Sequence, residues 1–95
     1  MIDNKQLQKM INDLKYDYDD EKITFFIELN DAHGEQVFQT MPFDTPQGAL
    51  DWWNDWCLFC DASEHELWLM YEVENSDIDR FCDVVMKNGK YVLEV

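Results

Sequence analysis

The chain is poor in cysteine, glycine and proline, and it is especially poor in basic residues. Its 95 residues include three Cys, three Gly, two Pro and seven Lys or Arg, against 21 Asp or Glu. No apolar run approaches the roughly 20 residues that a membrane span requires. The opening MIDNKQLQKMIND has no apolar signal-peptide core, and the cysteine count is odd. We therefore expect a cytoplasmic protein with reduced thiols, folded as one acidic domain over residues 1–95.

The shortage of cations excludes two classes of partner. With a net charge of −14, the chain cannot neutralise phosphates, so we expect neither direct nucleic-acid binding nor attachment to anionic lipid. Residues 23–79 contain no Lys or Arg and thirteen acids. Solubility alone needs a net charge of only about 2–8, so the surplus indicates that its field attracts a cationic partner. The alternatives are an acidic surface that serves solubility alone, or one adapted to high salt.

Sequence motifs for catalysis are also missing. The chain has no phosphate-binding loop, dinucleotide motif or serine-hydrolase motif, so we expect neither an enzyme nor a cofactor. Cys57 and Cys60 form a C-x-x-C pair at the end of an expected helix, where the dipole disfavours a reactive thiolate. A zinc site would need this pair together with Cys82, and His65 is available as a fourth ligand. Because no second metal-binding pair is present, three core thiols are favoured.

Apolar spacing predicts three helices. The first covers about residues 4–16, with Asp3 or Asn4 as its cap, and the second covers about 46–60 after Asp44-Thr45-Pro46. A third, short helix should follow the capping box of Ser76 and Asp79 and end at Asn88-Gly89. Its apolar face would consist of Ile78, Phe81, Cys82 and Val85.

Four β-branched and aromatic runs predict strands, at residues 23–29, 36–41, 65–73 and 91–95. The resulting order is α-β-β-α-β-α-β. It predicts an α+β domain with a four-stranded, mainly antiparallel sheet and helices packed on one face.

Side chains of the expected strand 65–73 alternate between the two faces of the sheet. Leu67 and Leu69 point to one face, whereas Trp68 and Met70 point to the other, which Phe26 shares. If helices cover the first face, the second exposes these apolar side chains among carboxylates, a pattern typical of protein-binding surfaces. The alternative is that a crossing helix or the second copy of a homodimer covers them.

Three features carry a resemblance to a known group of proteins: the cation-free span 23–79, the cluster Tyr16-Asp17-Tyr18-Asp19-Asp20-Glu21, and the aromatic helix Trp52-Trp53-Asn54-Asp55-Trp56. In size, charge and plan the chain resembles small acidic phage-encoded anti-defence inhibitors, namely anti-CRISPR, antirestriction and other DNA-mimic proteins. The resemblance implies a viral inhibitor that blocks the basic nucleic-acid-binding surface of a bacterial defence effector.

The carboxylate spacing agrees with this class. Carboxylates two apart on a strand lie about 6.6 Å apart, the same order as the spacing of phosphates along a nucleic acid. We expect the partner to be a basic nucleic-acid-binding protein or ribonucleoprotein, with Trp68 as an apolar anchor. The alternatives are an immunity protein that neutralises a cationic nuclease toxin, or a small zinc-binding module. The expected partner-binding residues are Asp17, Asp19, Asp20, Glu21, Glu66, Trp68, Glu72 and Glu74.

Overall fold

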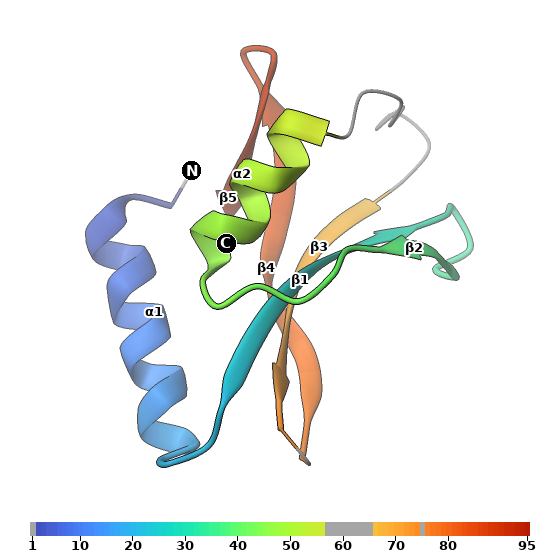
Figure 1. The fold of residues 1–95 in the computed structure, drawn as a ribbon. Coiled ribbons are helices and arrows are strands. Elements are labelled where there is room, and N and C mark those ends of the chain that lie inside the picture. Colours follow the sequence, from blue (N-terminus) through green and yellow to red (C-terminus); the bar gives the residue numbers. More distant parts are fainter. Residues whose placement is uncertain (1, 57–65, 75) are drawn as a thin grey trace.

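The computed structural model describes residues 2–56, 66–74 and 76–95. Within them it contains two helices and a five-stranded sheet (Figure 1). The element order is α-β-β-α-β-β-β, so the α+β class is confirmed, whereas the four-stranded sheet and the third helix are wrong. The elements are α1 (Asn4–Asp17), β1 (Ile23–Asn30), β2 (Gln36–Gln39), α2 (Pro46–Trp56), β3 (Glu66–Val73), β4 (Ile78–Lys87) and β5 (Lys90–Glu94).

Both helices begin at the expected capping signals. The Asp3 carboxylate accepts a hydrogen bond of 2.8 Å from the backbone N–H of Gln6 at the start of α1. The Thr45 hydroxyl accepts one of 3.0 Å from the N–H of Gly48, and Pro46 is the first residue of α2. The expected extension of this helix to Cys60 lies outside the described residues.

A β-bulge explains why residues 78–87 form a strand instead of the expected helix. Opposite β3, Cys82 faces Leu69 but Arg80 faces Met70, which leaves Phe81 as an extra residue on β4. Cys82 is buried in the core and Phe81 packs against it, so two consecutive apolar residues contact the same core. This pair breaks the alternation of a strand and mimics helical spacing.

The Asn88-Gly89 pair joins β4 to β5 as a two-residue hairpin turn. Both residues have positive φ, 53° and 78°, and Lys87 pairs with Lys90 across them. Asn-Gly is favoured in such turns because both positions require a left-handed backbone. The pair therefore closes a hairpin and does not end a helix.

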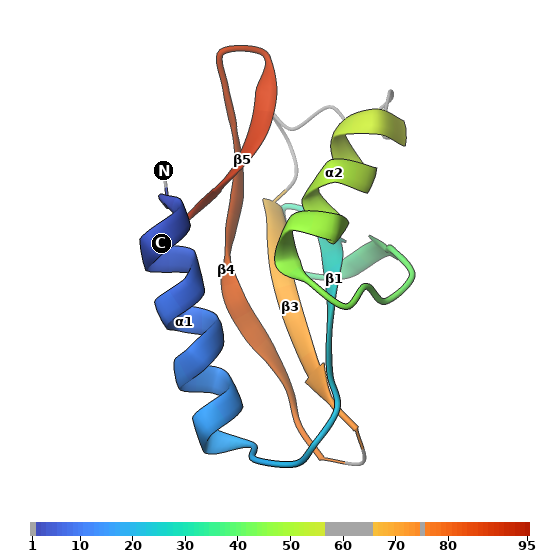
Figure 2. The ribbon, with the colours of Figure 1, turned by 60° about the vertical axis from the view of Figure 1, so that its left-hand side comes forward.

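The five strands form an antiparallel sheet in the order β2-β1-β3-β4-β5. Figure 2 shows α1 and α2 standing apart on the same face of this sheet. Side chains of both helices belong to one core cluster, so the expectation that the helices share one face is confirmed. The cluster contains Leu14, Ala49, Leu50 and Trp53 from the helices, and Phe25, Ile27, Leu67, Leu69, Cys82, Val84, Tyr91 and Leu93 from the sheet.

The outer edge of β5 is covered by contacts with α2 and with the start of the chain. The Asn54 side chain donates to the Tyr91 carbonyl at 3.1 Å and accepts from the Tyr91 N–H at 2.9 Å. The fully buried Trp53 meets the Tyr91 ring edge-on, with centroids 6.1 Å apart. The Ile2 N–H donates to the carbonyl of Leu93 at 3.0 Å. These contacts occupy backbone hydrogen-bonding groups along a strand edge that would otherwise be open to pairing with other chains.

Candidate protein-binding surface

Two connections far apart in the sequence lie side by side at one end of the molecule (Figures 1 and 2). The hydroxyl of Tyr18, in the α1–β1 connection, donates to Asp77 Oδ2, in the β3–β4 connection, at 3.0 Å. The backbone N–H of Glu74 donates to the carbonyl of Lys22 at 2.9 Å. These contacts continue the antiparallel pairing of β1 with β3. We call this region, residues 17–22, 72–74 and 76–79, the acidic end.

Tyr18 is the residue that links the two connections through its side chain. Its ring lies 6.2 Å from that of Tyr71, between centroids. Hydrogen bonding with Tyr71, followed by that with Asp77, raises the pKa of the Tyr18 phenol well above its ordinary value of 10.0. The phenol therefore stays protonated and remains a donor to the Asp77 carboxylate at physiological pH.

The acidic end concentrates the negative charge of the chain. It contains eight carboxylates and one lysine, so it carries a net charge of −7, half of the total of −14. Between described residues, the ion pairs are Arg80–Asp83 and Lys87–Glu94, and both lie outside it. Uncompensated charges on one side of a domain create a field that attracts a cationic partner. The carboxylates are those of Asp17, Asp19, Asp20, Glu21, Glu72, Glu74, Asp77 and Asp79.

The structure brings six of the eight predicted partner-binding residues into this end, and all six are exposed. Glu72 and Glu74 line a depression of about 340 Å³ with Lys22 and Thr24. Asp77 and Asp79 are further members that the predicted set missed; recognising β3 and β4 as a hairpin would have found them. The six are Asp17, Asp19, Asp20, Glu21, Glu72 and Glu74.

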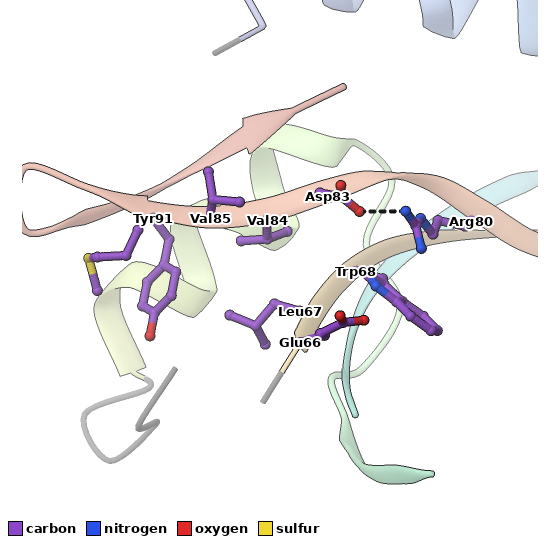
Figure 3. A pocket seen from close by; sticks show the side chains of 9 residues that line it. Glu66, Leu67, Trp68, Arg80, Asp83, Val84, Val85 and Tyr91 are labelled. Carbon is purple, nitrogen blue, oxygen red and sulfur yellow. Dashed lines mark ion pairs between the residues drawn. The ribbon is translucent and has the colours of Figure 1, made fainter. Parts of the chain in front are cut away.

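The other two predicted residues, Glu66 and Trp68, lie toward the opposite end of β3. Trp68 is half-buried, and the guanidinium of Arg80 lies 4.9 Å from its ring centroid, a cation–π contact (Figure 3). Arg80 Nη2 is also 2.9 Å from Asp83 Oδ1. Trp68 therefore already has a cationic partner within its own chain, and its role as an anchor stays a prediction.

Phe26 was expected to be exposed beside Trp68 on the open face of the sheet, and this expectation is wrong. Phe26 is only 6% exposed, although it lies opposite Met70 on that face. The open face is therefore less apolar than the alternation of residues indicated.

The C-x-x-C pair, Cys57 and Cys60, lies outside the described residues, and so does His65. Of the residues considered for redox chemistry or a zinc site, the structure describes only Cys82. Cys82 is a free thiol in the core, and burial raises its pKa to about 12. A thiol of this kind is protonated at neutral pH and is a poor nucleophile or metal ligand. In residues 2–56, 66–74 and 76–95, no three His, Cys, Asp or Glu side chains are grouped so that they could hold a metal ion.

Comparisons with known proteins assign no family to this fold and surface: no family model, curated protein or solved structure matches the chain. Across the described residues, neither helix has the length and apolar character needed to cross a membrane.

Proposed function

We propose that this chain is a protein-binding inhibitor whose acidic end occupies the basic nucleic-acid-binding surface of a larger protein or ribonucleoprotein. One observation supports this function above the others. Eight exposed carboxylates from two distant segments are gathered at one end, and no cation of the described residues forms an ion pair with them.

The backbone that carries these carboxylates is held in place before a partner arrives. Glu72 belongs to β3, which is paired on both sides, by β1 and by β4. Asp20 is held in the left-handed region, with φ of 64°, and the N–H of Glu21 donates to the Tyr18 carbonyl at 3.2 Å. A preformed charge arrangement loses less conformational entropy on binding, which favours a tight complex.

The chemistry of the partner follows from the charge. A surface that binds DNA or RNA presents Lys and Arg to phosphates, and an acidic protein can meet the same side chains. Attraction over a Debye length of about 8 Å speeds the encounter. The resemblance in size and charge to phage anti-defence inhibitors makes bacterial defence effectors the first candidates.

The test is competition between this protein and DNA. Restriction enzymes and CRISPR effector complexes would be bound to a fluorescent target duplex, and release of the duplex would be measured by anisotropy. The test variant carries Asp19→Asn, Glu72→Gln and Glu74→Gln. The matched control carries Glu35→Gln, Asp51→Asn and Asp55→Asn, which remove the same charge elsewhere. We expect the test variant to lose about tenfold to 100-fold in inhibition, and the control to lose much less.

The dependence on salt completes the test. Inhibition should weaken steeply toward about 1 M NaCl, where the Debye length falls to about 3 Å. Equal losses in the two triple variants, or inhibition that high salt does not weaken, would contradict binding through the acidic end. Failure to release DNA from any basic effector would contradict the proposed function as a whole.

A further inference from the structure

A groove runs between α1 and the start of α2, beside the acidic end. Its larger part has a volume of about 370 Å³ and is lined by α1, the α1–β1 connection, the start of β1 and residues 44–46. A second part of about 300 Å³ continues along α1 toward its N-terminus. Each part falls in the range of ligand pockets, about 300–1,000 Å³. The two parts share Gln8, Ile11, Thr45 and Pro46.

Ile11 is the side chain that makes this groove unusual. Within the described part of the chain, Leu7, Met10 and Leu14 of α1 belong to the core or pack against it, whereas Ile11 does not. Ile11 is nevertheless half-buried, and it lines both parts of the groove. An apolar side chain that faces a groove instead of the core is available to an apolar group of a partner.

The rest of the groove combines an apolar floor with an anionic rim. Leu14, Phe25 and Pro46, which are buried, contribute to the floor. The charged side chains that line its larger part carry a net charge of −3, because four carboxylates face one lysine. A second copy of this chain, at −14, is disfavoured as an occupant by charge repulsion. The charged lining residues are Lys15, Asp19, Asp20, Glu21 and Asp44.

We propose that this groove binds a cationic amphipathic segment of the partner. One or two apolar side chains of the segment contact Ile11 and Pro46, and flanking Lys or Arg side chains meet the carboxylates of Asp20 and Asp44. The inference rests on the proposed function, because it locates the apolar anchor of the same charge-led complex. The direction of anchoring is the reverse of that expected from Trp68: the partner supplies the apolar group and this chain supplies the pocket.

The probe for the experiment is an amphipathic peptide of about 18 residues, made of Leu and Lys at helical spacing. An isocharged peptide in which every Leu is replaced by Gln serves as the comparison. Affinities are measured by fluorescence anisotropy, and the site is mapped from isoleucine and leucine methyl shifts in NMR spectra. We expect the Leu–Lys peptide to shift Ile11, Leu14 and Ile23, and to bind at least tenfold more tightly than the Gln–Lys peptide.

Two variants on one helix make the test specific. Ile11→Gln removes the apolar contact, and we expect it to weaken the Leu–Lys peptide about tenfold. Tyr16→Gln is the matched control: Tyr16 lies on the same helix, is 86% exposed and does not line the groove. It should leave the affinity unchanged. Gln8→Trp fills the groove from an exposed position and should weaken peptide binding as Ile11→Gln does. Agreement between the two variants would show that the loss in Ile11→Gln does not come from a folding defect.

The outcomes separate this inference from the proposed function. Equal binding of the two peptides, equal losses in the Ile11 and Tyr16 variants, or no binding at all would overturn the groove. Charge-led inhibition by the acidic end could still hold in each case, because the DNA-release assay measures it independently. Binding that depends on Ile11, with no effector inhibited, would retain the groove and contradict the proposed function.

Discussion

The acidic end and the β4–β5 hairpin use charge in opposite ways. At the hairpin, Arg80 lies 2.9 Å from Asp83 and Lys87 lies 2.9 Å from Glu94. Hydrogen bonding to Lys87 also lowers the pKa of the Glu94 carboxyl. At the acidic end, the sequence contains eight carboxylates and one lysine. The negative charge is therefore not spread evenly: at the hairpin Arg80 and Lys87 each form an ion pair, whereas the acidic end has a large excess of acids.

The difference also shows what holds each region in place. The ion pairs of the hairpin are partly exposed, with side-chain exposures of 38–49%, and such pairs contribute little to stability. Packing and the hydrogen bonds of Asn54 hold the hairpin against α2. At the acidic end, backbone hydrogen bonds and the Tyr18–Asp77 contact fix the two connections. The carboxylates of the acids at positions 17, 19, 20, 21, 72 and 74 take no part in the Tyr18–Asp77 contact, which leaves them available to a ligand.

The largest effect on this comparison should come from Asn54→Ala, which releases the hairpin from α2. The substitution removes two hydrogen bonds to the Tyr91 backbone, of 2.9 and 3.1 Å. We expect a loss of about 1–3 kcal/mol in the free energy of unfolding, measured by urea denaturation. Asn12→Ala is the matched control, because Asn12 lies exposed on α1, and its substitution should change stability by less than about 0.5 kcal/mol. A similar loss in both variants would show that the Asn54 contact does not hold the hairpin.

Local signals predicted much of this fold. The cap at Asp3 and the apolar stripe of α1 identify a helix, and the alternation around Leu67 and Leu69 identifies β3. The bulge at Phe81 was not predictable in this way, because it is defined by pairing with β3 and not by neighbours in the sequence. Strand order depends in the same way on contacts between distant residues.

The same distinction between local signals and contacts of distant residues applies to the candidate surface. The cluster Asp17–Glu21 could be identified from the sequence, because its charge is local. Its proximity to Glu72 and Glu74 could not, because it follows from the register of β1 on β3, in which Thr24 faces Glu72. The position of Arg80 over Trp68 depends on the bulge, and the groove at Ile11 depends on how α1 and α2 share one sheet face.

Alkaline pH should distinguish the two regions with a smaller effect. Burial raises the pKa of Cys82, on β4, from 9.0 to about 12. Hydrogen bonding with Tyr71 and Asp77 raises that of Tyr18, at the acidic end, above 10.0. Above these ordinary values the unfolded chain ionises while the native groups stay protonated. The contribution of these groups to the free energy of unfolding is therefore complete below pH 9 and is lost as the pH rises toward 12. For the thiol the loss is up to about 1.4 kcal/mol per pH unit.

Two variants assign this alkaline slope in urea denaturation at a series of pH values. Cys82→Ala should remove the part that begins near pH 9, and Tyr18→Phe the part that begins near pH 10. Retention of the full slope in either variant would show that its group does not carry the expected share.

The smallest effect should be on the melting temperature, which two Glu→Gln substitutions on strands should change in opposite directions. Glu94→Gln removes the partner of Lys87 and should lower the melting temperature at low salt, an effect that disappears as the pH falls below 4.5 and protonates Glu94 in the wild type. Glu72→Gln relieves repulsion at the acidic end and should raise the melting temperature by about 1–3 °C. Both shifts should shrink in about 1 M NaCl, because salt screens exposed charges. Differential scanning calorimetry at both salt concentrations measures them. If both substitutions lowered the melting temperature, the carboxylates of the acidic end would be part of what stabilises the fold, and the contrast between the two regions would be wrong.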